Sequence, residues 1–349
     1  MENPYSLVFG KMPTNFIERD NEIGEIIETF SEQEPSIRTY ILTGIRGCGK
    51  TVALSRIEKE FRENKDFIVL SLNSDLNLLN STAEELYQIA NHLDIFKNID
   101  FGFSIMGASI EKKSHVSDES ANLKVDKLLN EFTKKNKRVL FCIDEISNTQ
   151  NIKAFFQAFN IWLRKDYDVV IVMTGLKKNI LSLQGDNRIS FLKRAEKKEL
   201  GNLNIRAIKS NYEANLGVTG EVAVKMAQLT KGYSYAFQVL GYLCFKHGKP
   251  YTDIIDLFDE KLANNVYDII WDDLTEKEKD LLNALINSPS LTTKDILSSS
   301  NIDSNTYNEY RNILITKGLI KSIGYGKIEL ILPRFAEIAK EQLQLGMWQ

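Results

Sequence analysis

One stretch of eight residues constrains the fold of this chain more than any other. Gly44-Ile45-Arg46-Gly47-Cys48-Gly49-Lys50-Thr51 matches the pattern G-x-x-x-x-G-K-[S/T] in full. The apolar run at 39–43 predicts a strand before it, and the apolar spacing at 52–57 predicts a helix after it. Glycines let the backbone wrap closely around a phosphate, and N–H groups at the start of a helix attract its negative charge. The sequence therefore predicts a phosphate-binding loop for a nucleotide, ATP with Mg²⁺.

The side chains that close this phosphate loop suit two further tasks of a nucleotide site. Lys50 can reach the β- and γ-phosphates, and the Thr51 hydroxyl can hold Mg²⁺. A glycine turn with an unrelated lysine is the alternative, and the strand and helix predicted around the loop argue against it. The predicted nucleotide contacts run through the loop into the following helix: Gly44, Ile45, Arg46, Gly47, Cys48, Gly49, Lys50, Thr51 and Val52.

A second apolar strand, residues 139–143, runs into the acidic pair Asp144 and Glu145. Ligands of open α/β sheets bind outside the carboxyl ends of the strands, so Asp144 can complete a Mg²⁺ shell there. Glu145 can polarise an attacking water as a general base. Many strands end in acidic residues, so this assignment depends on the phosphate loop.

Two more predicted strands end in polar residues. Thr174 ends the strand at 168–174, where its hydroxyl would lie beside the γ-phosphate and sense it. A plain strand-ending threonine is the alternative. Asn73 follows the strand at 67–72 and could hydrogen-bond Glu145, although asparagine also commonly ends strands.

Arg188 and Arg194 lie in one amphipathic segment after the last of these strands. An arginine that reaches the γ-phosphate of a neighbouring subunit acts as a finger, which stabilises the charge of the transition state. Both are candidate fingers, and two ordinary surface arginines are the alternative. A finger supplied in this way would require the protein to self-associate.

Strands alternate with helices up to about residue 204, and the strand signal then stops. This alternation predicts an α/β fold in three layers, with a parallel sheet covered by helices on both faces. We predict an ATPase core at 1–204, an all-helical lid at 205–268 and a winged-helix domain at 269–349. Residues 101–112 alternate bulky apolar and small residues and are expected to form an inserted hairpin.

Three short helices and a hairpin between residues 275 and 332 are typical of a winged helix, a variant of the helix-turn-helix. If it binds duplex DNA, the helix at 304–317 would enter the major groove, and Lys317, Lys321 and Lys327 could contact phosphates. A winged helix that contacts protein instead is the alternative. The predicted DNA-binding residues are Asn305, Thr306, Asn308, Tyr310 and Arg311.

With these motifs the chain resembles the AAA+ ATPases of the origin-recognition and initiator type, and the neighbouring STAND signalling ATPases. The similarity rests on the phosphate loop, the strands that end at Asp144 and Thr174, and two further segments, 16–22 (FIERDNE) and 231–238 (KGYSYAFQ). It covers almost the whole chain. It implies the AAA+ fold and Mg²⁺-dependent hydrolysis of ATP to ADP.

The chain departs from these families at three places. Glu18 replaces the glycine of the lead-in segment, and Ser234 stands where STAND proteins have proline. Tyr235 and Ala236 stand where initiators have a second sensor arginine. The resemblance then implies that the lid senses nucleotide by packing on the adenine, with slow hydrolysis typical of a switch.

Bulk properties exclude several other classes of protein. The formal net charge is −3, so any contact with DNA must be local. Three cysteines and three histidines show no metal-ligand spacing. No apolar run approaches the roughly 20 residues of a membrane span, and the first residues do not resemble a signal peptide. We expect a cytoplasmic protein with no membrane partner.

Two functions follow from the sequence. In the first, ATP controls the assembly of the protein on double-stranded DNA, which the winged helix binds. In the second, the protein is a nucleotide-gated signalling switch whose winged helix contacts a protein partner. A metabolic kinase is a weaker third reading, because the acidic pair suits activation of water and no acceptor pocket is legible in the sequence.

Overall fold

The computed structural model describes residues 2–8, 10, 12–93, 118–288, 290–300 and 302–348. The hairpin expected at 101–112 lies outside the described residues. Contacts divide the chain into two compact units. The sheet unit holds Asp20–Thr43 and Ala53–Glu199, and the helical unit holds Met1–Arg19, Gly44–Val52 and Leu200–Gln349. The phosphate loop therefore belongs to the helical unit.

The sheet unit is built on five parallel strands in the order β2-β3-β4-β1-β5, as an α/β fold of this class predicts. Four of the strands are mostly buried, and they are those expected from apolar runs. The fifth, β5, has the sequence Glu-Lys-Lys-Glu and was not expected. The strands are β1 (Thr39–Thr43), β2 (Phe67–Asn73), β3 (Arg138–Asp144), β4 (Val169–Gly175) and β5 (Glu196–Glu199).

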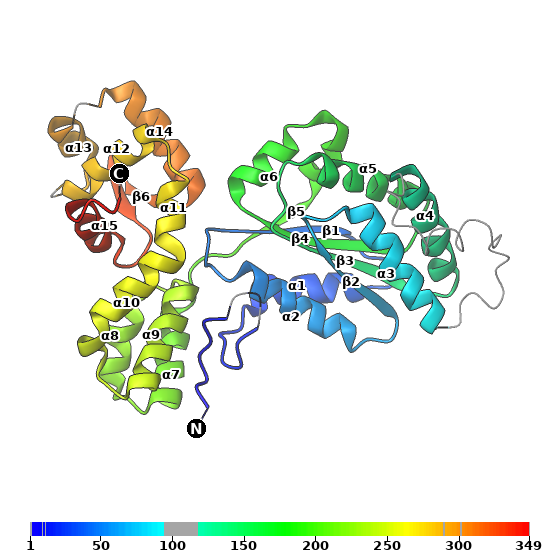
Figure 1. Cartoon of the computed structure of the whole chain (residues 1–349), viewed down its shortest axis with the longest axis horizontal. Helices are drawn as coiled ribbons and strands as arrows, with labels where there is room; N and C mark the ends of the chain where they lie inside the picture. The colour runs from blue at the N-terminus through cyan, green and yellow to red at the C-terminus, as the bar shows by residue number, and fades with distance from the viewer. Residues whose placement is uncertain are drawn as a thin grey trace. The chain divides into compact units, whose positions relative to one another are not determined.

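Helices cover both faces of this sheet, which gives the three layers (Figure 1). On one face, Phe141 of β3 stacks on Trp162 of α5, within an apolar core that α3 and α4 complete. On the other face, Tyr40 of β1 packs against Phe30 of α1, which in turn contacts Phe61 of α2. The helices are α1 (Asp20–Ser31), α2 (Lys50–Arg62), α3 (Leu78–His92), α4 (Asp118–Lys134), α5 (Gln150–Arg164), α6 (Lys177–Gln184) and the 3-10 helix η2 (Asn187–Arg194).

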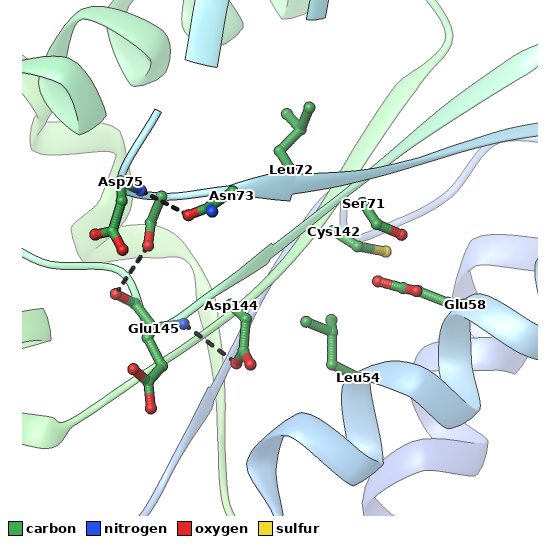
Figure 2. Close-up of a pocket in the computed structure, with 10 residues that line it drawn as sticks. Leu54, Glu58, Ser71, Leu72, Asn73, Asp75, Cys142, Asp144 and Glu145 are labelled. Carbon is green, nitrogen blue, oxygen red and sulfur yellow. Dashed lines mark hydrogen bonds between the residues drawn. The ribbon is translucent and has the colours of Figure 1, made fainter. Parts of the chain in front are cut away.

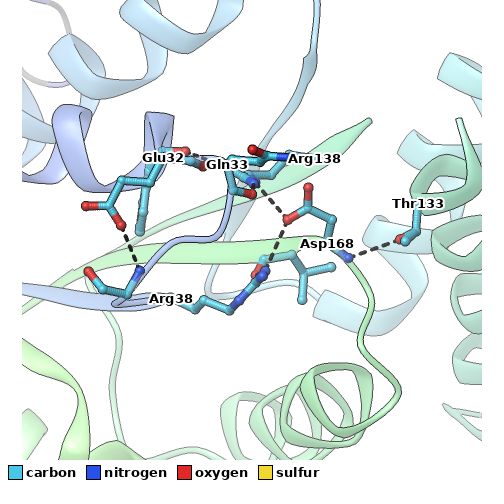
Figure 3. Close-up of polar contacts among 9 residues, drawn as sticks. Glu32, Gln33, Arg38, Thr133, Arg138 and Asp168 are labelled. Carbon is cyan, nitrogen blue, oxygen red and sulfur yellow. Dashed lines mark hydrogen bonds and ion pairs between the residues drawn. The ribbon is translucent and has the colours of Figure 1, made fainter. Parts of the chain in front are cut away.

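A buried arginine fastens the end of α1 to the amino edge of the sheet (Figure 3). Arg138, the first residue of β3, is 8% exposed and forms an ion pair with Asp168 at 2.7 Å. Asp168 also pairs with Arg38 at 3.1 Å. The last turn of α1 has no basic residue of its own, so a side chain from β3 takes that role. The guanidinium donates to three carbonyl oxygens at 2.5–2.8 Å, those of Phe30, Glu32 and Gln33.

The helical unit contains an all-helical region followed by a hairpin and helices of the winged-helix type, as the sequence predicts (Figure 1). One apolar core runs through both regions, from Val239 to Tyr267, Leu281, Leu314 and Ile328. A capping box, in which Thr275 and Glu278 bond each other's backbone, begins α12. The helix α15 was not expected.

The elements of the helical region are α7 (Ile205–Leu216), α8 (Gly220–Leu229), α9 (Ser234–His247), η3 (Tyr251–Ile254), α10 (Ile255–Leu262), the π-helix η4 (Ala263–Tyr267) and α11 (Asp268–Asp272). The winged helix consists of α12 (Glu276–Asn287), α13 (Thr293–Ser299), α14 (Ser304–Lys317), β6 (Ile320–Gly324), β7 (Lys327–Leu330) and α15 (Phe335–Gln344). None of the described helices is long and apolar enough to span a membrane.

Candidate nucleotide site

The phosphate loop leads from β1 into α2 and has the backbone that its glycines permit. Gly47 and Gly49 have φ angles of 74° and 96°, which residues with a Cβ rarely adopt. Lys50 begins α2 and is 8% exposed. Its ammonium donates to the carbonyls of Gly44 at 3.2 Å and Ile45 at 2.9 Å. A loop of this shape around a buried lysine suits a polyphosphate.

The start of α9 holds the outer side of the phosphate loop. Three consecutive loop carbonyls accept hydrogen bonds from the three residues at that helix start. Arg46 accepts from the Tyr233 hydroxyl at 2.7 Å, Gly47 from the Tyr235 N–H at 3.1 Å, and Cys48 from the Ser234 hydroxyl at 2.8 Å.

Arg19, in the lead-in segment, strengthens the same contact. Its guanidinium donates to the Cys48 carbonyl at 2.9 Å and to the Ser234 hydroxyl at 3.1 Å. A third bond reaches the carbonyl of Gly201, after the last strand, at 2.9 Å. Burial raises the pKa of the Cys48 thiol, and the nearby Lys50 and Arg19 charges offset only part of that rise. The thiol is therefore neutral in this cationic setting.

The carboxyl ends of β3 and β4 bring Asp144, Glu145 and Thr174 together in the sheet unit. The Thr174 hydroxyl is fully buried, donates to a carboxylate oxygen of Asp144, and accepts from the Glu145 N–H at 3.0 Å. Glu145 has a φ angle of 53°, a strained conformation for a residue with a long side chain. Thr174 thus holds the acidic pair in one conformation. This arrangement gives the predicted sensor residue a physical task that its position in the sequence did not reveal.

A pocket of about 350 Å³ lies beside this acidic pair, within the sheet unit (Figure 2). Burial raises the pKa of the Cys142 thiol on its wall well above the usual value, and Glu58 adds to the rise, so the thiol stays protonated. The residues that line the pocket come from α2, β2, β3 and the turns that follow these strands: Leu54, Glu58, Ser71, Leu72, Asn73, Ser74, Asp75, Cys142, Asp144 and Glu145.

The hydrogen bond expected between Asn73 and Glu145 does not form in the part of the chain that the structure describes. The Asn73 side chain accepts from the Asp75 N–H at 2.9 Å instead, because it closes the turn at the end of β2. Figure 2 shows the Glu145 carboxylate directed away from Asn73. The commoner role of asparagine as a strand terminator is the correct one here.

The residues present fit a magnesium nucleotide rather than a metal held by protein alone. Within the described ranges, no three or more His, Cys, Asp or Glu side chains form a group that could hold a metal ion. Mg²⁺ is usually bound through one or two carboxylates together with phosphates and water. Asp144 in the sheet unit offers a carboxylate and Thr51 in the helical unit offers a hydroxyl, and each by itself suits that chemistry.

The two candidate finger arginines differ in their surroundings. Arg188 forms a two-pronged ion pair with Asp186, at 3.0 Å and 2.6 Å, and this pair lowers the pKa of the Asp186 carboxyl. Asp186 is also paired with Lys153 at 3.2 Å. Arg194 is exposed at the end of η2, and no ion pair joins it to another described residue. Arg194 is therefore the better placed of the two to reach another molecule.

The predicted DNA-binding residues lie on two sides of α14. Asn305 and Asn308 are exposed, with Arg311 half-buried next to them. Thr306 and Tyr310 lie on the other side, where Thr306 bonds the capping Asp303 at 2.6 Å and Tyr310 is half-buried under Lys277. All five lie on the helix that the sequence predicts, and they point to two sides of it because an α-helix turns 100° per residue. Sequence reasoning also missed Asn312, four residues after Asn308 on the exposed face.

Of the three lysines expected to contact DNA phosphates, Lys317 is already bound within the protein. It forms an ion pair with the buried Glu278 at 2.9 Å and also donates to the Asp273 carbonyl. Lys321 is exposed and pairs with Glu329 at 3.1 Å, and Lys327 is exposed on β7. The sequence does not reveal this ion pair, because Glu278 lies 39 residues away from Lys317.

Several solved structures are similar to this chain over nearly its whole length. A Walker-type ATPase of Pyrococcus abyssi gives a TM-score of 0.62 at 13% identity, covering 93% of this chain and 96% of that chain. The ORC2 protein of Aeropyrum pernix, in ADPNP–ADP complexes, gives 0.61 at 12% identity and covers 97% of each chain. Cdc6p of Pyrobaculum aerophilum gives 0.50 at 14% identity, covering 96% of this chain and 97% of that chain. This chain has the fold of the AAA+ ATPases.

Sequence comparison adds a match to one region. The family called Domain of unknown function (DUF8462) matches residues 264–338, which run from η4 into α15. No curated protein matches this chain in sequence. The similarity to AAA+ ATPases therefore concerns the fold, and the activity has to be argued from the site.

Proposed function

We propose that this protein binds ATP with Mg²⁺ and hydrolyses it slowly, as a nucleotide-controlled switch in the cytoplasm. The observation that carries the proposal is the phosphate loop, with its positive-φ glycines around the buried Lys50. The acidic pair held by Thr174 at the carboxyl edge of the parallel sheet supports it. One of the similar structures, the ORC2 protein, is a nucleotide complex.

Each polar residue has a chemical role in this proposal. Lys50 would bind the β- and γ-phosphates, and Thr51 and Asp144 would hold Mg²⁺, which would neutralise charge on the phosphates. Glu145 accepts the proton of the attacking water. Thr174 keeps Asp144 and Glu145 in place, because its hydroxyl bonds both of them. Hydrolysis is slow because Tyr235 and Ala236 stand in the lid where related proteins have a second arginine, whose positive charge would stabilise the transition state.

The test is nucleotide binding and turnover in two variants. Lys50→Ala should abolish binding of a fluorescent ATP analogue, and Glu145→Gln should keep binding but stop phosphate release. Lys59→Ala is the matched control, because Lys59 is exposed on the same helix α2. Undiminished binding by Lys50→Ala would remove the basis of the proposal. Unchanged turnover in Glu145→Gln would mean that another residue is the base.

A second proposal concerns the winged helix, which we infer to bind duplex DNA weakly and locally. The observation that favours DNA is the exposed face of α14, where Asn305, Asn308 and Asn312 follow one another at helical spacing. Asparagine side chains can read adenine through two hydrogen bonds in the major groove. The region at 269–349 carries nine lysine and arginine residues against eleven aspartate and glutamate residues, so general attraction to DNA is small.

The salt dependence of DNA binding tests this second proposal. If Lys294, Lys327 and Arg311 neutralise about three phosphates, the slope of log K against log salt should be about −3. Binding should strengthen with ATP, because each subunit of an ATP-dependent assembly adds contacts. Binding that is absent at low salt with ATP, with ADP and without nucleotide would exclude DNA and favour a protein partner of the winged helix.

A further inference from the structure

The contact between α9 and the phosphate loop has a property that a simple packing contact lacks. It engages three peptide groups in a row, those that join Arg46 to Gly47, Gly47 to Cys48, and Cys48 to Gly49. All three carbonyls accept a hydrogen bond from the segment Tyr233–Tyr235. Two of the donors are side-chain hydroxyls, so the contact depends on which residues stand there.

The Tyr233 side chain is closely fitted to the loop. It is 1% exposed, and its hydroxyl lies so near Gly47 that a Cβ added there would be 2.1 Å from the oxygen. Burial raises the pKa of Tyr233 well above its usual value, so the phenol keeps its proton at neutral pH. Tyr233 is therefore a permanent donor to the Arg46 carbonyl.

Peptide geometry gives this contact a consequence for phosphate binding. In a planar trans peptide the N–H points opposite to the carbonyl. Carbonyls fixed toward α9 therefore fix the N–H groups of Gly47, Cys48 and Gly49 on the other side of the loop. The Cys48 N–H donates to the Ile45 carbonyl at 3.3 Å, and the Lys50 ammonium donates to the same carbonyl at 2.9 Å. The Cys48 N–H thus lies on the same side of the loop as the Lys50 ammonium.

We propose that Tyr233, Ser234 and Tyr235 are positioning residues that hold the N–H groups of the phosphate loop ready to bind the phosphates of the nucleotide. This inference rests on the proposed function, since it assumes that the loop binds a nucleotide. Donors arranged before the ligand arrives cost no reordering when it binds, which strengthens binding.

The same contact lets the helical region sense the nucleotide. A phosphate would accept hydrogen bonds from the N–H groups of these peptides. The carbonyls of the same peptides accept hydrogen bonds from the α9 donors, so both partners affect the orientation of one peptide group. Coupling between two sites is reciprocal. If the α9 contact strengthens phosphate binding by a given free energy, phosphate binding strengthens the α9 contact by the same free energy. The sequence implied sensing through the adenine, and the hydrogen bonds of α9 offer a route through the phosphates.

The test is Tyr233→Phe, which removes one hydroxyl and leaves the ring. We expect the dissociation constant for ADP, and KM for ATP, to rise about fivefold with kcat little changed, because one buried hydrogen bond is lost. Tripolyphosphate, which has no base or sugar, should weaken as a competitor by the same factor. Ser234→Ala should likewise raise the dissociation constant for ADP and KM for ATP, and should weaken competition by tripolyphosphate.

Two matched controls lie in the same unit. The buried hydroxyls of Tyr212 and Tyr267 also donate to backbone carbonyls, those of Phe237 at 2.9 Å and Pro333 at 2.7 Å. Tyr212→Phe and Tyr267→Phe should lower the midpoint of thermal unfolding about as much as Tyr233→Phe does, with no effect on nucleotide affinity.

The outcomes separate this inference from the proposed function. Equal nucleotide affinity in Tyr233→Phe and in both controls would overturn the positioning role while the wild type still binds ATP. A loss for ADP with no loss for tripolyphosphate would also overturn it, because the contact would then act on the base or sugar. A wild type that binds no nucleotide would instead refute the proposed function.

Discussion

Gly318, which ends α14 of the winged helix, lies directly against the side chain of Ile45 in the phosphate loop. A Cβ added at Gly318 would be 2.0 Å from Ile45 Cγ2, far inside van der Waals contact. Gly318 also has a φ angle of 74°, so both its conformation and its neighbour require glycine. The winged helix and the phosphate loop are therefore fitted to each other within the helical unit.

This fit predicts a specific interaction between two substitutions. Gly318→Ala should lower the free energy of unfolding by more than the ~1 kcal/mol expected for alanine at a positive φ, because Ile45 must also move. Gly217→Ala is the matched control, since Gly217 ends α7 with a φ of 63° and has no neighbour within 4 Å of an added Cβ.

Ile45→Ala should remove the excess cost of Gly318→Ala, since it removes the Cγ2 atom. Urea unfolding of both single variants and the double variant should give an interaction energy of about 1 kcal/mol. Strict additivity of the two changes would show that the contact does not exist in solution. Ile45 occupies a variable position of the loop pattern, so the double variant keeps the motif intact.

The second prediction concerns Thr174. Thr174→Val keeps the shape of the side chain but removes the bonds to Asp144 and to the Glu145 N–H. We expect ATP hydrolysis to fall about 10- to 100-fold, as when other residues that orient a metal or its ligands are lost, with a higher Mg²⁺ requirement. Steady-state kinetics at varied Mg²⁺ would measure both effects.

Two controls bracket the Thr174 result. Thr174→Ser keeps the hydroxyl and should retain most of the activity. Thr82→Val should be harmless, because the Thr82 hydroxyl of α3 is buried with no hydrogen-bond partner among the described residues. If Thr174→Val and Thr82→Val hydrolyse ATP equally fast, Thr174 has no positioning role.

The third prediction decides between the two arginines. Arg194→Ala should lower hydrolysis by at least about 10-fold if Arg194 acts on a neighbouring subunit, because fingers contribute about 10³–10⁵. Arg188→Ala should be near wild type, since Arg188 is already paired with Asp186. Mixing Arg194→Ala with Lys50→Ala should raise turnover above the sum of the two variants measured alone, because one supplies an intact nucleotide site and the other an intact finger. No gain on mixing would place any finger action elsewhere.

The fourth prediction follows from the buried thiols. Cys48, Cys142 and Cys244 are 3%, 1% and 8% exposed, and burial raises the pKa of each thiol, that of Cys244 to about 12. The reactive thiolate is therefore scarce in the folded protein at pH 8. Iodoacetamide should label native protein slowly and label three thiols quickly in urea. Rapid labelling of one native thiol would contradict this.

The same shifts make stability depend on pH above neutrality. The folded-state pKa of these thiols lies above the unfolded value of about 8.5. Their contribution to stability is therefore complete below about pH 8.5 and is lost as pH rises through the folded-state pKa. The free energy of unfolding of the wild type should fall from pH 8 to pH 11. The free energy of unfolding of Cys244→Ala should fall less steeply over the same range.

The main features of the fold were predictable because they depend on local patterns. Each of the four expected strands contains a run of apolar residues, which is buried on both faces in β1, β3 and β4 and leaves only Ser71 and Asn73 exposed in β2. The phosphate loop has a fixed spacing. β5 could not be predicted, since Glu-Lys-Lys-Glu has no apolar residue. Among the strands that the structure describes it lies at the edge of the sheet and pairs with β1 alone, and charged residues are common on edge strands.

The contacts of the candidate site were much less predictable, because they join residues far apart in the sequence. Nothing near Lys317 shows that Glu278 will bind it, and nothing near Arg46 shows that Tyr233 will donate to its carbonyl. The segment at 231–238 was singled out for its resemblance to known families and for the proline and arginine that it lacks. The role of Tyr233, Ser234 and Tyr235 becomes visible only in the structure, where these residues donate hydrogen bonds to carbonyls of the phosphate loop.

The last prediction concerns stability at the amino edge of the sheet. Arg138→Met should lower the free energy of unfolding by about 3 kcal/mol, because three carbonyls lose a donor and Asp168 loses a buried partner. Arg138→Lys should recover only part of this, since one ammonium cannot reach three carbonyls and a carboxylate at once. Urea unfolding followed by circular dichroism would measure both.

Lys137→Met is the control for this edge. Lys137 is the neighbouring residue, is more exposed, and pairs with Asp66 at 3.5 Å, so its loss should cost less than about 1 kcal/mol. Nucleotide affinity should be unchanged in folded Arg138→Met, because Arg138 begins β3 and Asp144 ends it. An Arg138→Met protein as stable as Lys137→Met would mean that solvent replaces the guanidinium, and that the end of α1 does not depend on it.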